Sequence, residues 1–296
     1  DRAADPDSAS KATEIAMGAA VSAWNMAPGS DRDFETRLLK SVCQEILELY
    51  PQSSRGSEAR IRLAIVYRTM NEPLEAARWY LDVPETDPQY ASARISAGQS
   101  YWAAWTQRAA TAAAEDPENA NTQSADMQSW KTEAHNLLTQ GIQITRDRIG
   151  ADAKPSDELV AAEVSLASIL NLDGDFQGAI TRLTSGGQNS VVAAIQMPEG
   201  EARPDDGIQS KSFTGLTFRL LLRAYVGTQQ IEQALTVMTQ LENVGGQDVL
   251  AVYTQLGVEL QEELPRLKQS NDRERLAHTR DSFEKFLQKV YESRNK

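Results

Sequence analysis

Apolar side chains recur along this chain at the three- and four-residue spacing of amphipathic helices. The stretch 34–49 follows this pattern and predicts one helix, which ends at Tyr50 and Pro51. The stretch 13–24 predicts a second helix ahead of it. The same spacing returns at intervals through the rest of the chain, so we expect an all-α fold.

The helical pattern repeats with a period of 34 residues. In a unit that starts at Ser57, positions 7, 8, 11, 20, 24 and 32 hold Leu63, Ala64, Tyr67, Ala76, Tyr80 and Pro88. The next unit starts without a gap at Ala91, and Ala97, Gly98 and Tyr101 take positions 7, 8 and 11. Small residues on facing helices allow a close approach. The period therefore predicts repeated helix pairs.

Further units are predicted to start at Val160 and Gly215, and a fifth near residue 250. Two segments interrupt the period. Residues 109–128 are rich in Ala, Glu, Asp and Asn and predict a helical or irregular insertion, whereas 185–211 contain glycines and prolines typical of a long surface loop. An apolar stripe at 283–290 predicts a terminal helix that closes the array.

The large, small, aromatic, Ala, aromatic and Pro positions of these units resemble the tetratricopeptide repeat (TPR) family. The resemblance implies an all-α, right-handed superhelix of antiparallel helix pairs, with two long insertions and a C-terminal capping helix. The turn at 71–73 and the stretch 174–179 also resemble the turn between the two helices of such a repeat. We accordingly expect a flexible N-terminus at 1–9, a degenerate helix pair at 10–56 and the repeat array at 57–296.

The net charge and the cysteine content limit the classes of partner and the kinds of site that this chain can have. A formal net charge of -12 would repel nucleic-acid phosphates and anionic membrane surfaces. The only cysteine, Cys43, permits neither an intramolecular disulfide nor a thiolate metal cage, and its helical context predicts burial. We found no apolar run long enough for a transmembrane helix.

The start of the chain at Asp1, followed by small and polar residues, predicts a processed or trimmed N-terminus. Residues 50–59 resemble linkers of bacterial periplasmic and outer-membrane-associated repeat proteins. We therefore expect a periplasmic or secreted protein, and a cytoplasmic location stays open.

The sequence contains no recognisable catalytic motif. His135 and His278 lie in predicted helices without a second histidine at metal-ligand spacing, and the Asp173–Asp175 stretch lacks the distal acid of a calcium loop. We expect a non-catalytic protein without cofactor or bound metal.

The TPR resemblance implies a concave groove lined by positions 2, 5, 9, 12 and 13 of each first helix. Ile61 and Ile65 occupy such positions, and the residues that we predict to bind a ligand are Arg68, Gln99, Trp102, Asn171, Arg219 and Arg223. This mixture of amide, aromatic and cationic groups suits an extended peptide or protein segment that carries negative charge.

Three alternatives stay open. Arg219 and Arg223 could instead pair with acids of their own chain. Trp102 and Trp105, with nearby acids, could serve a glycan-binding or carbohydrate-processing protein. The chain could also be a purely structural subunit of an assembly.

Overall fold

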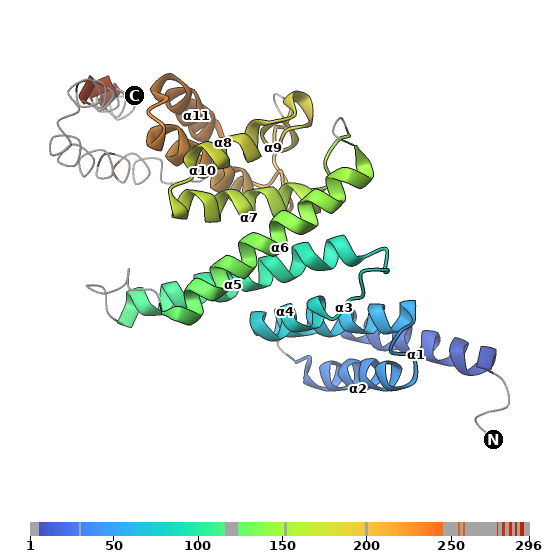
Figure 1. Cartoon of the computed structure of the whole chain (residues 1–296). Helices are drawn as coiled ribbons and strands as arrows, with labels where there is room; N and C mark the ends of the chain where they lie inside the picture. Colours follow the sequence, from blue (N-terminus) through green and yellow to red (C-terminus); the bar gives the residue numbers. More distant parts are fainter. Residues whose placement is uncertain are drawn as a thin grey trace. The chain divides into compact units, whose positions relative to one another are not determined.

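The computed structural model describes residues 6–29, 31–115, 124–150, 153–198 and 201–244, together with isolated positions between 254 and 292. The elements that it describes are helices, so this is an all-α protein of helices packed in sequential pairs (Figure 1). The chain divides into two compact units, Asp1–Arg148 and Ile149–Lys296, and each is described by itself.

The first unit is a succession of helices in which each packs on the next. Its described helices are α1 (Pro6–Met26), α2 (Asp33–Leu49), α3 (Ser54–Thr69), α4 (Pro73–Leu81), α5 (Tyr90–Glu115) and α6 (Ala125–Ile149). Ser53 caps the N-terminus of α3 through a hydrogen bond from the Gly56 N–H, and Pro73 begins α4, where its missing N–H costs nothing. Short connections thus fold the unit back on itself.

Small residues allow close approach between the helices of the first unit. Ala64 and Ala76, on α3 and α4, are fully buried. A Cβ atom at Gly98 of α5 would lie 2.8 Å from the Leu138 Cγ of α6, and one at Gly141 would lie 2.9 Å from the Ala91 carbonyl oxygen. The backbones of α5 and α6 are therefore in close contact along their shared length.

The second unit packs its helices around one apolar cluster. Its described elements are α7 (Asp157–Asp173), α8 (Phe176–Thr184), the 3₁₀ turn η1 (Gly187–Asn189), α9 (Val191–Ala194), α10 (Lys211–Gly227) and α11 (Ile231–Val244). Ala167, Ala179 and Ala234 are buried in this cluster beside Leu222. The predicted small positions of these helix pairs thus lie in the core.

Both predicted insertions contain helical structure. Helix α5 continues to Glu115 and α6 begins at Ala125, so much of 109–128 extends this pair, and 116–123 lie outside the described residues. The stretch 185–211 holds η1 and α9, and the Arg203 guanidinium donates hydrogen bonds to the Ile195 carbonyl, the Gln209 carbonyl and Thr214 Oγ1. This second stretch is therefore anchored to α10 instead of extending into solvent.

The ends of the predicted array are described only in part. Helix α1 begins at Pro6, within the N-terminal stretch expected to be flexible. The fifth unit near residue 250 and the terminal helix at 283–290 fall almost entirely outside the described residues.

One turn recurs in three helix pairs. Asn71, Gly174 and Gln229 adopt left-handed backbone conformations with φ of 62°, 79° and 61°. The residue after each donates its N–H to a carbonyl five positions earlier, at 2.8–2.9 Å, as in a Schellman motif. Each left-handed residue is the fifteenth of the unit that starts at Ser57, Val160 or Gly215. The same position of the unit thus carries the same turn in the backbone, although insertions separate the three units by more than 34 residues.

Candidate functional site

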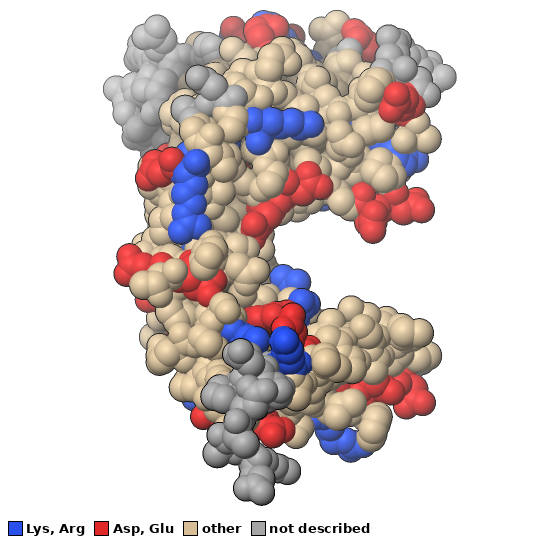
Figure 2. Space-filling view, turned by 90° about the vertical axis from the view of Figure 1, so that its right-hand side faces the viewer, with Lys and Arg blue, Asp and Glu red and all other residues tan. Residues whose placement is uncertain are grey.

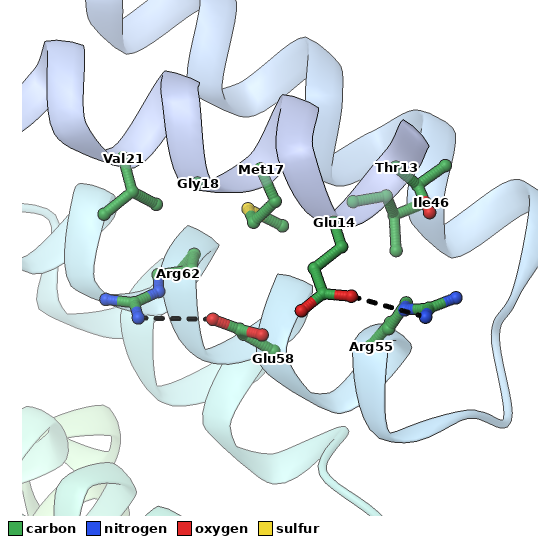
Figure 3. Close-up of a pocket in the computed structure, with 9 residues that line it drawn as sticks. All are labelled: Thr13, Glu14, Met17, Gly18, Val21, Ile46, Arg55, Glu58 and Arg62. Atoms are coloured by element: carbon green, nitrogen blue, oxygen red, sulfur yellow. Dashed lines mark hydrogen bonds and ion pairs between the residues drawn. The ribbon is translucent and has the colours of Figure 1, made fainter. Parts of the chain in front are cut away.

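A cavity of about 210 Å³ opens between α1 and α3 of the first unit (Figure 3). Met17, Val21 and Ile46 form its apolar wall, and charged side chains of α1 and α3 form the rest. The full lining is Thr13, Glu14, Met17, Gly18, Val21, Ile46, Arg55, Glu58 and Arg62. The cavity lies where α3 packs on α2 and α4 and makes little contact with α1.

Two ion pairs lie at the charged side of this cavity. The Arg55 guanidinium is 3.8 Å from the Glu14 carboxylate on the neighbouring helix, and Arg62 is 3.2 Å from Glu58 one turn earlier on α3. The side chains of Glu58 and Arg62 are 49% and 36% exposed, so solvent screens their attraction. Glu58 and Arg62 can therefore separate and bind other charged groups at a small cost in free energy.

A second hollow of about 550 Å³ adjoins the first along α3. It is lined by Ser54, Glu58, Ile61, Arg62, Asp87, Pro88 and Gln89. The Asp87 carboxylate accepts a hydrogen bond from the Gln89 N–H at 2.8 Å, which orders the chain before α5. Glu58 and Arg62 line both hollows, so the two adjoin at this ion pair, and we call them together the α3 groove.

Cys43 lies beneath the α3 groove and contributes to packing. It is fully buried, and its thiol is 3.9 Å from Met17 Sδ. Burial raises the pKa of Cys43 to about 12, although the nearby Arg62 charge opposes the rise. The thiol is therefore protonated at neutral pH and is a poor nucleophile.

A third hollow of about 390 Å³ lies between α4, α5 and α6. Its lining includes Pro73, Leu74, Ala104 and the half-buried Trp130. Sequence reasoning did not single out Trp130, because the predicted insertion at 109–128 left the start of the next helix undefined. The hollow is shallow and largely apolar, and it holds fewer charged groups than the α3 groove.

The six residues predicted to bind a ligand are distributed over both units. Arg68, Gln99 and Trp102 lie in the first unit, and Asn171, Arg219 and Arg223 in the second. None of the six lines the α3 groove. Ile61, at a predicted groove position, does line it, and so does Glu58 at position 2 of the same unit. The family positions could therefore have identified Glu58, whereas Arg55 and Arg62 fall outside them.

Trp102 and Asn171 are held by their own chain. The Trp102 ring stacks on Trp105 with centroids 4.8 Å apart, so each ring presents one face to the other. Asn171 is buried, and its Nδ2 donates to the Leu220 carbonyl at 2.8 Å. Asn171 therefore joins α7 to α10 within the core of the second unit.

Charged groups of both signs are mixed on the face that Figure 2 shows. In Figure 2 acidic and basic side chains lie among one another on the face shown, without one large patch of either sign. Among the described residues no set of three or more His, Cys, Asp and Glu side chains could hold a metal ion. His135 is half-buried on α6, and His278 lies outside the described part of the chain. Within that part, we also find no helix with the length and apolar character needed to cross a bilayer.

Comparisons with known proteins add little to this description. No family model matches the chain, and no curated protein matches it. Among solved structures it is similar to a chain in the crystal structure of the APC/C hetero-tetramer Cut9-Hcn1, with 18% identity and a TM-score of 0.33. That likeness covers 86% of this chain but only 46% of the other. We therefore base the fold on the described helices themselves.

Proposed function

We propose that this protein is a TPR-like, non-catalytic scaffold that binds an extended segment of another protein in the α3 groove. One observation supports it most directly: two adjoining hollows run along one face of α3 and share the Glu58–Arg62 pair. Adjoining hollows beside a helix are the kind of surface that accepts a peptide.

The lining of the groove holds three acids and two arginines, so acidic side chains of a bound peptide would have to lie against the two arginines. Met17, Val21 and Ile61 offer apolar contacts, while Arg55 and Arg62 offer guanidinium donors. An exposed ion pair four residues apart on a helix contributes only about 0.3–0.5 kcal/mol. Arg62 makes a single contact of 3.2 Å with Glu58, whereas a ligand carboxylate that replaces Glu58 could bind this guanidinium through two hydrogen bonds. In this proposal Arg55 and Arg62 bind the acidic side chains of the partner, although the protein as a whole has a negative net charge.

The compartment belongs to the same proposal. Residues 50–59 resemble linkers of bacterial envelope repeat proteins, and this stretch leads directly into α3. We accordingly place the protein in the bacterial periplasm or outside the cell, where its partner would be an envelope or secreted protein.

The proposal is tested with fluorescent ten-residue peptides of equal length that contain zero, two or four acidic residues. Their dissociation constants would be measured by anisotropy with wild-type protein, Arg62→Ala and Arg78→Ala. Arg78 is the matched control, because it pairs with Glu75 on the surface of α4 and lines neither hollow. We expect acidic peptides to bind the wild type and the control alike, and Arg62→Ala to weaken binding about tenfold, as for the loss of a charged hydrogen bond.

Equal affinities for Arg62→Ala and Arg78→Ala would contradict the assignment of the groove. Failure of every peptide to bind the wild type would contradict the scaffold itself. Tryptophan fluorescence quenched by oligosaccharides, and not by acidic peptides, would favour the glycan-binding alternative at Trp102 and Trp105.

A further inference from the structure

The cavity between α1 and α3, hereafter the first hollow, has an apolar wall with room for one more side chain. Met17 and Ile46 are 5% and 2% exposed, and a Cβ atom at Gly18 would meet no atom within 4 Å. Figure 3 shows Met17, Gly18 and Val21 on the part of α1 that faces α3. The volume of about 210 Å³ exceeds the roughly 150 Å³ in which an apolar protein cavity holds benzene. A leucine, methionine or phenylalanine side chain of a ligand therefore fits there.

The second hollow carries more negative than positive charge. Its charged lining consists of Glu58, Arg62 and Asp87. Within the described part of the chain, Glu58 pairs with Arg62, whereas Asp87 has no basic partner. One oxygen of Asp87 accepts the Gln89 N–H at 2.8 Å, which orients the carboxylate. A carboxylate held in this way is an acceptor for a lysine or arginine side chain of a ligand.

Binding of an acidic side chain to Arg62 strengthens this preference for a base. A ligand carboxylate that replaces Glu58 leaves Glu58 without its arginine, so the hollow then contains the carboxylates of Glu58, Asp87 and the ligand beside one guanidinium. Like charges at short range repel one another. A cationic side chain of the same ligand lowers this excess of negative charge, so a segment with an acid and a base complements the hollow better than one with acids alone.

The places of these groups along the groove set the order of the ligand side chains. Met17 and Gly18 line only the first hollow, and Asp87 lines only the second. The Glu58–Arg62 pair lies where the two hollows adjoin. A segment that crosses α3 therefore meets the apolar wall, then Arg62 and then Asp87.

We propose that the segment bound in the α3 groove carries an apolar, an acidic and a basic side chain in this order across α3. The apolar side chain fills the first hollow beside Gly18, the acid binds Arg62 and the base binds Asp87. This inference rests on the proposed function of the groove and names the sequence pattern of its partner. The central position of the acid distinguishes this pattern from an acidic segment in general.

The order is tested with fluorescent ten-residue peptides that contain one leucine, two adjacent glutamates and one lysine among serines and glycines. In the test peptides the glutamates lie between leucine and lysine, in both chain directions and with one to three residues between neighbours. The control peptides have the same composition, with lysine between leucine and the glutamates. We expect the best test peptide to bind wild-type protein about tenfold more tightly than its control, as measured by anisotropy.

Two variants test the two ends of the pattern with the best test peptide. Gly18→Leu fills the first hollow and should weaken binding about tenfold, whereas a peptide with serine in place of leucine should bind both proteins alike. Asp87→Asn keeps an acceptor for the Gln89 N–H but removes the charge. It should weaken binding about fivefold, and the effect should disappear with serine in place of lysine.

The matched controls are Gly29→Leu and Asp82→Asn, which should leave binding unchanged. A Cβ atom at Gly29 also meets no atom within 4 Å, Asp82 is exposed, and neither residue lines a hollow. Circular dichroism would verify that all four variants stay folded.

Equal binding of test and control peptides, or Gly18→Leu and Asp87→Asn proteins that bind like their controls, would overturn this inference. The groove itself would still stand if a peptide with two glutamates, and neither leucine nor lysine, bound the wild type and lost affinity with Arg62→Ala. An effect of only one variant would overturn the end of the pattern that the other variant tests. Failure of every peptide to bind the wild type would overturn both the inference and the proposed function.

Discussion

The first unit packs its helix pairs around separate apolar clusters, whereas the described helices of the second share one. Met17, Cys43 and Leu63 belong to one cluster of the first unit, and Ala76 and Tyr80 to another. In the second unit a single cluster extends from α7 to α11. The cluster that includes Met17 and Cys43 lies beneath the α3 groove. The hollows and ion pairs of this groove thus occur in the unit whose apolar core is divided.

The polar groups of the two units differ in the same way. Arg55 and Arg62 of the first unit bind exposed carboxylates. Arg203 of the second donates to two carbonyls and a hydroxyl of its own fold, and burial lowers its pKa from the usual value. Arg94 of the first unit plays a similar part to Arg203, since it donates to the Leu81 and Val83 carbonyls between α4 and α5. What distinguishes Arg55 and Arg62 is that both line hollows of the surface.

The largest effect should come from filling the close contact between α5 and α6. Gly98→Leu would force a side chain against the Ala134 carbonyl and the Leu138 backbone, where a Cβ already meets atoms at 2.8–3.1 Å. We expect a loss of at least about 3 kcal/mol in the free energy of unfolding, at the upper end for overpacking. Hydrogen exchange should show lost protection in the first unit and unchanged amides in α7–α11.

Gly18→Leu is the control for that variant, because a Cβ at Gly18 meets no atom within 4 Å. Its melting temperature should stay near that of the wild type. Equal destabilisation by the two variants would contradict the close packing of α5 on α6.

A smaller loss is expected in the second unit from Asn171→Ala. The variant removes both the hydrogen bond to the Leu220 carbonyl and the packing of a buried side chain, and we expect about 2 kcal/mol of destabilisation. Urea denaturation would measure it, with Leu172→Ala as the control at the exposed neighbouring position. A loss of ligand binding by a fully stable Asn171→Ala would instead assign this residue to a binding surface.

The smallest effect is a pH dependence located in the first unit. The pKa of Cys43 is raised from 9.0 to about 12 in the folded protein, so the unfolded chain loses the thiol proton first. Its contribution to stability is complete below pH 9 and is lost as the pH rises towards 12. Between pH 8 and pH 10 the wild type should lose about 1 kcal/mol more than Cys43→Ala. Parallel stability curves for the two proteins would refute this.

The repeated helix pairs could be predicted because close helix packing leaves few choices of residue. Ala64, Ala76, Ala167, Ala179 and Ala234 stand at predicted small positions, and all are buried. A large side chain at such a position would separate the helices. Small residues therefore recur at these positions, and the pattern can be found in the sequence. The course of 109–128 was less predictable, since alanine and acidic residues suit both an extended helix and an irregular segment.

The α3 groove was less accessible to sequence reasoning than the helices around it. Groove positions in a repeat follow from regular stacking, and they did select Ile61. Arg55 and Arg62 line the groove because α3 stands away from α1, a packing detail that no local pattern records. The prediction placed Asn171 on a binding surface because it assumed that the next helix pair stacks regularly on α7. In the structure the Asn171 amide donates to the α10 backbone, and Arg203 anchors the segment that leads into α10.

The turn shared by three helix pairs has an evolutionary consequence. Asn71, Gly174 and Gln229 are chemically different, yet each reverses the chain with the same backbone conformation. Asn, Gly and Gln can all adopt this conformation, so the residue at the turn can vary while the entry into the second helix stays the same. The path of the chain through these helix pairs is therefore more constant than the sequence that encodes it.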